Sequence, residues 1–258
     1  MAQELQDRVA VVTGASKGIG LAAAEALAAV GARVVAVSRT SSPGLEALVE
    51  ETGARWVPAD LSDPQGVARL AEAAGSRVDI LVNNVGSAVA RTGGFLSITD
   101  DQWRRSLDLN LLVAVSVTRA ILPAMLEAGG SVINIGSVNA VFPDPAVIDY
   151  SAGKAALVNF SKALSKEFGG RGVRVNSISP GPVETDLWLG AGGIADATAA
   201  AAGLTPDQVR AQAAGGIVSG RFSRPQEVAE FVVFLASDRT ANVLGADFTV
   251  DGGFITTT

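Results

Sequence analysis

Short apolar runs rich in valine and isoleucine alternate with alanine-rich stretches of helical periodicity along the whole chain. The apolar runs predict seven strands, at residues 9–13, 33–38, 56–59, 80–83, 131–136, 174–179 and 247–250. The stretches between them predict helices, the first at residues 18–30. Strands that are apolar throughout and separated by helices are typical of a parallel sheet covered on both faces. The pattern therefore predicts an α/β fold, with a doubly wound, seven-stranded parallel sheet in a single domain over residues 1–258.

Three predicted helices begin with a hydroxyl side chain and have a glutamine three residues later, a pattern that caps a helix N-terminus. The pairs are Thr99 with Gln102, Thr205 with Gln208, and Ser223 with Gln226. One segment, residues 190–216, is rich in alanine and glycine and departs from the alternation. We interpret residues 186–216 as a lid over a substrate site, and a plain surface excursion explains the segment equally well.

The amino-acid composition limits the chemistry that this chain can perform. It has 258 residues, of which 48% are hydrophobic, and no histidine or cysteine. Disulfides, zinc sites built on Cys or His, and Ser-His-Asp or Cys-His nucleophilic machinery are therefore excluded, and we expect no metal. A net charge of −6 argues against a nucleic-acid partner. The polar N-terminus and the lack of a membrane-length apolar run predict a soluble, cytoplasmic protein with no membrane partner.

A glycine-rich stretch lies where the first predicted strand gives way to the first predicted helix. Glycines let the backbone turn sharply and let a pyrophosphate approach, and a helix N-terminus supplies N–H donors. In an open α/β sheet, ligands bind at the carboxyl ends of the strands, where this loop lies. The stretch TGASKGIG therefore predicts a dinucleotide site. Its predicted residues are Gly14, Ser16, Lys17, Gly18, Ile19 and Gly20.

The end of the second predicted strand bears on which dinucleotide binds. An acidic residue there would bind the ribose 2′-hydroxyl of NAD, but this chain has Ser38 and Arg39. Arg39, together with Lys17, would attract the 2′-phosphate of NADP(H) through charge-assisted hydrogen bonds. We therefore expect NADP(H) rather than NAD(H). The alternative is that both cations are ordinary solvated side chains.

Polar or turn-forming residues follow four further predicted strands at the same edge of the sheet. Taken alone, most of them are better explained as turn or helix-cap residues. Asn110 lies inside an apolar helical run, so its amide belongs either to a structural network or to a site. Ser137 follows the fifth predicted strand and faces the same crevice. The other candidates are Asp60, Leu61, Asn83, Val85, Gly86, Pro180, Gly181, Val183 and Thr185.

Tyr150 and Lys154 are four residues apart in a predicted helix, so their side chains lie on the same face. A free phenol has a pKa of about 10, and a nearby ammonium favours the phenolate and lowers that pKa. Such a pair can exchange a proton with a substrate oxygen. In isolation, a half-buried tyrosine beside a solvated lysine is the commoner explanation. The glycine loop and the residues at the strand ends favour an active site instead.

Together these motifs resemble those of the short-chain dehydrogenase/reductase family, in its common single-domain form with 3-oxoacyl-reductase and carbonyl-reductase members. The resemblance covers nearly the whole chain, through TGASKGIG, Asp60, NNVG, Asn110, Ser137, YSAGK, SPGPVET and Asp251-Gly-Gly. It implies a Rossmann fold, cytoplasmic location, and assembly as a homotetramer or homodimer. Val85 stands where the family usually has alanine, and we expect this change to leave cofactor binding intact.

The resemblance also implies a role for each matching residue. Tyr150 would be the general acid in carbonyl reduction and the general base in alcohol oxidation. Lys154 would bind the nicotinamide ribose and lower the pKa of Tyr150. Ser137 would hydrogen-bond the substrate oxygen, and Asn110 would hold a water of the proton relay. The implied cofactor contacts are the glycine loop with the pyrophosphate, Asp60 with adenine, Asn83 with the ribose, and Val183 and Thr185 with the carboxamide.

We therefore expect an NADP(H)-dependent oxidoreductase that interconverts a ketone and a secondary alcohol, acting on a small or medium ketone, a diketone or a 3-oxoacyl group. One alternative is an NAD-linked dehydrogenase of a secondary alcohol or sugar. A dinucleotide-sensing protein without turnover is disfavoured, because such proteins typically lose the tyrosine or the lysine. Phe142, Leu187, Trp188 and Leu189 predict an apolar substrate wall, and the lack of a cationic cluster in residues 186–202 disfavours a highly anionic substrate.

Overall fold

A computed structural model describes residues 4–256, so both ends of the predicted domain lie outside the described residues. Seven strands in this range form one sheet in the order β3-β2-β1-β4-β5-β6-β7, and all neighbours are parallel. The strands are β1 (Val9–Thr13), β2 (Arg33–Ser38), β3 (Arg55–Pro58), β4 (Ile80–Asn83), β5 (Gly130–Ile135), β6 (Val173–Pro180) and β7 (Asp247–Val250). Each boundary lies within one residue of its predicted position, so the predicted fold class is confirmed.

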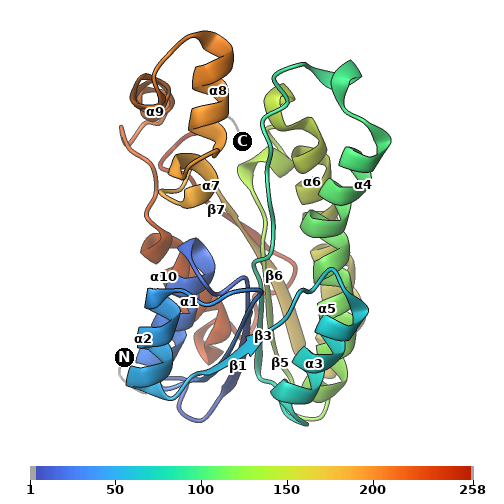
Figure 1. Ribbon diagram of the computed structural model, residues 1–258. Coiled ribbons are helices and arrows are strands. Elements are labelled where there is room, and N and C mark those ends of the chain that lie inside the picture. The colour runs from blue at the N-terminus through green and yellow to red at the C-terminus, as the bar shows by residue number, and fades with distance from the viewer. Residues whose placement is uncertain (1–3, 257–258) are drawn as a thin grey trace.

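Helices cover both faces of the sheet (Figure 1). One face carries α1 (Gly18–Ala29), α2 (Pro43–Thr52) and α10 (Pro225–Ala236), and the other carries α3 (Pro64–Ala74), α5 (Val113–Met125) and α6 (Ile148–Phe168). Successive side chains of β1 enter opposite layers, since Ala10 and Val12 are buried in one apolar cluster and Val11 in the other. The two clusters hold the sheet rigidly between its helices.

One element is apolar enough to resemble a membrane span. α4 (Asp100–Leu107), a π-helical segment (Asp108–Leu112) and α5 continue as one helix of 26 residues, which contains an 18-residue window with a mean hydropathy of 1.5. By length and composition alone this helix could cross a bilayer. In this fold, Val117, Ile121 and Met125 of α5 are fully buried against the sheet. A core helix of a globular protein meets the same criteria, and this one occupies such a place.

The strand order opens a cleft at the carboxyl edge of the sheet. β1 and β4 are neighbours, yet the chain leaves β1 toward β2 and leaves β4 toward β5, which creates a topological switch point. Above this edge lie α7 (Asp186–Leu189), α8 (Ile194–Ala202) and α9 (Pro206–Gly215), apart from the two helix layers (Figure 1). Ala195, Ala199 and Val209 form a small apolar cluster within them. These three helices occupy the segment for which we predict a lid.

Two of the three predicted helix caps are confirmed. Thr99 caps α4 and Thr205 caps α9, each by reciprocal hydrogen bonds with the glutamine three residues later. The third predicted pair, Ser223 with Gln226, is wrong, because α10 begins two residues after Ser223.

The start of α10 is capped by a carboxylate instead of a hydroxyl. Arg224 is the N-cap residue, and its backbone N–H donates to Glu227 Oε2 at 2.7 Å. Glu227 also accepts two hydrogen bonds from the Arg221 guanidinium, at 2.8 and 2.6 Å. This ion pair fixes Glu227 at the helix start, where a negative charge is favourable.

Candidate active site

A tight loop joins β1 to α1 and fits a dinucleotide pyrophosphate. Gly14 and Gly18 have φ angles of 64° and 56°, in the left-handed region that favours glycine. A Cβ on Gly20 would lie 2.2 Å from the carbonyl oxygen of Gly14, so no side chain fits there. Lys17 occupies the N-cap position of α1 without a side-chain cap, which leaves the first N–H groups of the helix available to an anion.

Asn84 holds this loop from the end of β4. Its Nδ2 donates to the carbonyl oxygens of Thr13 and Gly14 at 3.1 and 3.2 Å. The Asn83 side chain, for which the family resemblance implies a contact with the ribose, is buried on the opposite side of the strand and donates to side chains of α5 and β5, and that contact stays a prediction. Because side chains alternate along a strand, only one of two adjacent asparagines can face the cleft. That alternation was the signal that could have identified Asn84.

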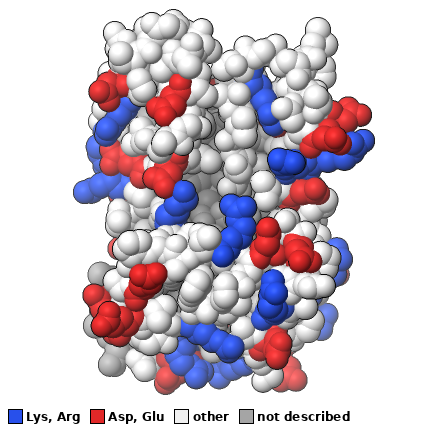
Figure 2. All heavy atoms as spheres, in the orientation of Figure 1, with Lys and Arg blue, Asp and Glu red and all other residues white. Residues whose placement is uncertain are grey.

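The residues at the carboxyl edge surround one large cavity of about 1250 Å³. Figure 2 shows a hollow in the middle of this face with basic side chains beside it. The predicted residues that line the cavity are Gly14, Ser16, Lys17, Gly18, Ile19, Ser38, Arg39, Asp60, Leu61, Val85, Gly86, Ser137, Tyr150, Lys154, Pro180, Gly181, Val183 and Thr185. Gly20, Asn83 and Asn110 are predicted site residues that do not line it. Within residues 4–256, no group of three or more His, Cys, Asp or Glu could hold a metal ion.

Arg39 is exposed at one end of the cavity, next to Asp60. Hydrogen bonds from the Ser62 hydroxyl and backbone N–H, at 2.7 and 3.0 Å, lower the pKa of Asp60, and the Arg39 charge acts in the same direction. The Ser38 hydroxyl is used by the fold, since it donates to a backbone carbonyl two residues later and accepts from Trp56 Nε1 at 3.0 Å. Arg39 makes no ion pair among the described residues, so its guanidinium can meet a phosphate.

Lys17 forms an ion pair across the mouth of the cavity. Its Nζ lies 2.9 Å from Asp186 Oδ2, and both side chains are largely exposed. Close by, a Cβ on Gly18 would lie 3.2 Å from the Thr185 side chain. The glycine loop between β1 and α1, called the phosphate loop below, is therefore in close contact with the start of α7. The loop and the segment for which we predict a lid therefore meet at two points.

Lys154 is almost fully buried on α6 beside the cavity. Its Nζ donates to the carbonyl oxygen of Ile135 at 2.7 Å and lies 5.7 Å from the centre of the Tyr150 ring. Burial lowers the pKa of Lys154 to about 8, because a charged ammonium is poorly solvated there. A Cβ on Gly86 would lie 3.1 Å from this Nζ, which explains the glycine in NNVG.

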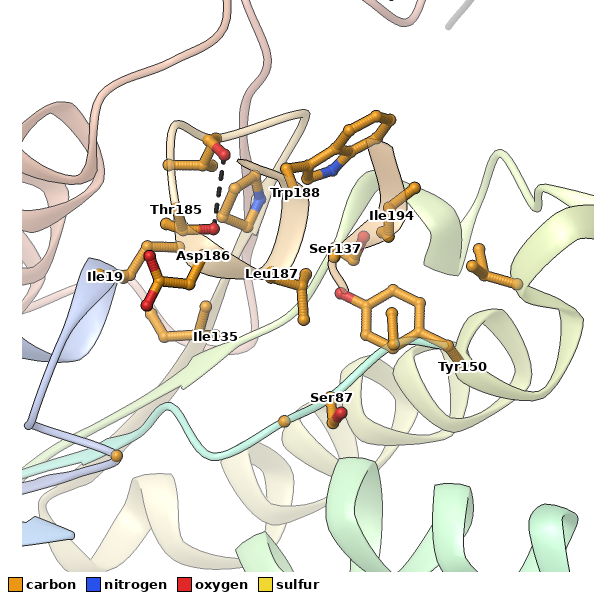
Figure 3. A pocket seen from close by; sticks show the side chains of 18 of the residues that line it. Ile19, Ser87, Ile135, Ser137, Tyr150, Thr185, Asp186, Leu187, Trp188 and Ile194 are labelled. Atoms are coloured by element: carbon orange, nitrogen blue, oxygen red, sulfur yellow. Dashed lines mark hydrogen bonds between the residues drawn. The ribbon is translucent and has the colours of Figure 1, made fainter. Parts of the chain in front are cut away.

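Tyr150 is half-buried, and its hydroxyl points toward Ser137 at the end of β5 (Figure 3). Burial raises the pKa of Tyr150, while the Ser137 hydroxyl acts in the opposite direction. The net shift of this pKa is upward, and the lowering effect expected of the Lys154 ammonium stays a prediction. At neutral pH the side chain is a phenol that can donate its proton.

Asn110 lies in the π-helical turn between α4 and α5 and is 1% exposed. Its Oδ1 accepts from the backbone N–H of Ser87 at 3.0 Å, and its Nδ2 donates to the Ser87 carbonyl at 2.8 Å. The same Nδ2 donates to the Ser106 carbonyl at 2.9 Å. Asn110 thus fixes Ser87, which lines the cavity wall near Tyr150 (Figure 3). Its role in holding a water stays a prediction.

The far end of the cavity is mostly apolar. Phe142, Leu187 and Trp188 line it as expected, whereas Leu189 does not. Phe254, which sequence reasoning missed, also lines it, and its ring packs edge-on against Phe142 at 5.9 Å between centroids. Because Phe254 is more than a hundred residues from Phe142 in sequence, no local pattern could have paired them.

Known proteins share this architecture and sequence. The sequence model of a family described as "Enoyl-(Acyl carrier protein) reductase" matches residues 14–255. The 3-oxoacyl-(acyl-carrier-protein) reductase FabG of Escherichia coli is 35% identical over 254 residues, covering 96% of this chain and 97% of that protein. The D-threitol dehydrogenase of Mycolicibacterium smegmatis is 39% identical over 263 residues, covering 97% and 94%.

A solved structure is also similar to this chain in fold and in sequence. The crystal structure of L-sorbose reductase from Gluconobacter frateurii, complexed with NADPH and L-sorbose, has a TM-score of 0.90 and 34% identity and covers 100% of both chains. With the parallel sheet, the glycine loop and the Tyr150–Lys154 helix face, these matches show that the chain belongs to the short-chain dehydrogenase/reductase family of oxidoreductases, among its 3-oxoacyl-reductase-like members.

Proposed function

We propose that this protein is an NADP(H)-dependent oxidoreductase that interconverts a ketone and a secondary alcohol. The observation that carries the proposal is that Ser137, Tyr150 and Lys154 share one cavity with a loop shaped for a pyrophosphate. The L-sorbose reductase that has the same fold was solved with NADPH bound. The cavity exceeds the usual ~300–1000 Å³ of a small-ligand site, as a dinucleotide together with a substrate requires.

The cofactor would lie along the carboxyl edge of the sheet. The N–H groups at the start of α1 would bind the pyrophosphate, and Arg39 would bind a 2′-phosphate at the adenosine end. Lys154 would hold the nicotinamide ribose, with Val183 and Thr185 at the carboxamide. When bound, the dinucleotide supplies or accepts a hydride, and the protein supplies orientation and the proton.

The proton would come from Tyr150. In carbonyl reduction, the phenol O–H bond breaks and the proton goes to the carbonyl oxygen, while the carbonyl carbon receives the hydride. The hydroxyl of Ser137, toward which Tyr150 points, would hold that oxygen in place. The raised pKa of Tyr150 supports this direction, because a phenol that stays protonated at neutral pH is a proton donor.

The cavity wall favours a neutral substrate. The cations that line the cavity are Lys17, Arg39 and Lys154, and each has a place on the cofactor side. The substrate end has aromatic and aliphatic side chains, and the carboxylate of Asp144 also faces it. A small or medium ketone, a diketone or the neutral end of a 3-oxoacyl group would fit this surface, whereas a substrate with a carboxylate near its carbonyl would meet no cation.

Cofactor titration tests the proposal. Nucleotide fluorescence should show tighter binding of NADPH than of NADH, and the protein should then oxidise NADPH with ketones, diketones or 3-oxoacyl thioesters. Arg39→Asp should weaken NADPH binding about tenfold to a hundredfold and change NADH binding little, as expected for a lost charged hydrogen bond.

Lys17→Ala is the matched control for this test. Because Lys17 is paired with Asp186, its replacement should weaken NADPH binding less than Arg39→Asp does. Equal losses of NADPH and NADH affinity in Arg39→Asp would contradict the choice of NADP(H).

A second function has specific support. The D-threitol dehydrogenase relative acts by name on a polyol, which favours the alternative of an NAD-linked dehydrogenase of a secondary alcohol or sugar. Tight NADH and weak NADPH binding, with turnover of polyols and NAD but not of ketones and NADPH, would establish this alternative.

The assembly and location of the protein are also part of the proposal. We expect a cytoplasmic homotetramer or homodimer without nucleic-acid or membrane partners, as the family resemblance suggests. Sedimentation analysis of the purified protein tests the assembly, and a monomer at micromolar concentration would contradict it.

A further inference from the structure

An ion pair lies buried directly behind the proposed acid–base residue. The guanidinium of Arg91 contacts the carboxylate of Asp149 through Nε, at 3.3 and 3.1 Å to its two oxygens, and through a terminal nitrogen as well. The Asp149 side chain is 1% exposed and the Arg91 side chain 10%. Asp149 immediately precedes Tyr150 in the first turn of α6. Neither partner lines the cavity, so neither touches a substrate or a cofactor there.

The pair joins two segments that are far apart in the sequence. Arg91 lies in the loop that follows β4, and its backbone N–H also donates to the Ala146 carbonyl at 2.7 Å. Ala146 belongs to the short helix (Pro145–Val147) that leads into α6. Arg91 therefore binds this region at two places. Its side chain contacts the first turn of α6, and its backbone N–H contacts the short helix that leads into α6.

The loop itself is fixed at three points, and Arg91 is the last of them. Asn84 ties its beginning to the phosphate loop, and Asn110 ties Ser87 by two hydrogen bonds. Ser87, which Asn110 holds, and the next residue, Ala88, both line the cavity, and Ser87 lies near Tyr150 (Figure 3). Displacement of the third anchor would shift this wall and the start of α6 together.

Stability alone is a poor explanation for such a pair. Removing two charges from water costs free energy that offsets much of the attraction between them. Well-packed apolar residues of similar size are therefore often as stabilising as a buried ion pair. A forked, planar contact does offer a fixed geometry, which an apolar contact does not. Val147, the N-cap residue of α6, makes no side-chain cap, so no cap of its own fixes the first turn of α6.

We infer that Arg91 and Asp149 are positioning residues, which hold the start of α6 and the Ser87–Ala88 wall so that the Tyr150 hydroxyl faces the substrate oxygen. This inference rests on the proposed function, because it assigns the pair a purpose in that reaction. A shift of about 1 Å at a reacting group can cost a hundredfold in rate, so a rigid anchor one residue from the acid has a direct kinetic effect.

The decisive variant replaces both charges at once, as Arg91→Met with Asp149→Leu. No charge is left unpaired, so the melting temperature should stay close to that of the wild type, and NADPH affinity should change less than about twofold because the phosphate loop is untouched. The kcat for ketone reduction should nevertheless fall about tenfold or more. The matched control is Arg104→Met with Asp101→Leu, which removes an exposed ion pair of 2.7 Å on α4 and should leave all three quantities unchanged.

A second readout does not depend on turnover. Tyr150 is the only tyrosine of the chain, so the absorbance of tyrosinate reports its titration alone. Loss of the anchor should change the burial of the phenol and so shift its pKa from the wild-type value, while the direct effects of the two opposite charges largely cancel. The control pair should leave this titration unchanged.

Wild-type kcat and an unchanged Tyr150 titration in the double variant would overturn the inference. If the double variant does not fold, Arg91→Lys decides, since it keeps the charge but loses the fork. A reduced kcat at wild-type NADPH affinity in Arg91→Lys supports the inference, and an unchanged kcat overturns it. If the wild-type protein reduces no ketone, the proposed function fails and the tyrosinate titration still decides whether the pair positions Tyr150.

Discussion

At the scale of single residues, burial sets the chemistry of the Tyr150–Lys154 pair. It raises the pKa of the phenol and lowers that of the ammonium to about 8, so each side chain is pushed toward its neutral form. Within residues 4–256, the one hydrogen-bond acceptor of the Lys154 ammonium is the carbonyl oxygen of Ile135. The charge of Lys154 is therefore more sensitive to pH near neutrality than the ordinary pKa of lysine suggests, whereas Tyr150 stays a neutral phenol there.

The pH dependence of ketone reduction follows from Lys154. Below a pH of about 8 the side chain is an ammonium, and above it a neutral amine that no longer favours release of the phenolic proton. We expect kcat to be level at neutral pH and to decline above about pH 8, and the decline should be absent from the residual activity of Lys154→Met. A pH–rate profile checks this, and a level profile to pH 10 or above in the wild type (about 2 units past the midpoint) would contradict it.

Single residues also mark the limit of sequence reasoning. The motifs identified Ser137, Tyr150 and Lys154, because their chemistry is local to the residue type and its spacing. They missed Asn84, since choosing between two adjacent asparagines requires the direction of the strand side chains. They missed Arg91 as well, because its partner lies 58 positions away and only the fold brings the two together.

At the scale of elements, the periodic patterns of the sequence were sufficient to predict the strands but not to predict where every helix begins. Every strand could be predicted within one residue, because a buried parallel strand needs a continuous apolar run. The start of α10 could not, because its cap is an acidic side chain that is held by a cation three residues before the N-cap. The π-helical turn at Asn110 could not either, and the two hydrogen bonds that Asn110 makes there join it to Ser87, which lies 23 positions away in the sequence.

The cap of α10 gives a stability prediction. Hydrogen bonds from Arg221 and the Arg224 backbone, together with the charges of both arginines, lower the pKa of Glu227 to about 2. A lowered carboxyl pKa contributes stability above the ordinary value of 4.5, and this contribution is lost as the pH falls toward about 2. Glu227→Gln should therefore lower the melting temperature at neutral pH by a few degrees, and the difference should shrink through this acid range.

Thermal unfolding across pH checks this effect, and the control is Glu230→Gln, a change at a neighbouring exposed carboxyl of the same helix. A difference between Glu227→Gln and the wild type that stayed constant from neutral pH to the acid limit would contradict the role of the ionised cap.

At the scale of the whole molecule, the parallel sheet gathers residues that are distant in sequence. Side chains that follow β1, β2, β3, β4, β5 and β6 all meet at one cavity, because the carboxyl ends of parallel strands lie at one edge. The alternation of strands and helices along the sequence could predict that these residues share one edge of the sheet. The sequence could not place α7, α8 and α9, whose own apolar cluster is small and whose contacts with the rest of the molecule include the exposed Lys17–Asp186 pair.

The predicted lid, residues 186–216, should be the least stable part of the described structure. Segments with few buried apolar contacts open locally at low free-energy cost. We expect amide hydrogens of residues 186–216 to exchange faster than those of β4 and β5, and to exchange more slowly once NADPH is bound. Exchange mass spectrometry with and without NADPH checks this. Protection of the segment equal to that of the central strands before NADPH is added would contradict a mobile lid.

The central claim is that Tyr150 donates the proton in an NADP(H)-dependent ketone reduction, and one comparison tests it most directly. NADPH oxidation with a ketone that the wild-type protein reduces should be measured in Tyr150→Phe, alongside NADPH affinity by fluorescence. The account predicts that turnover falls at least about a hundredfold while NADPH affinity changes less than about twofold, because only the proton donor is removed. Wild-type turnover in Tyr150→Phe would contradict it.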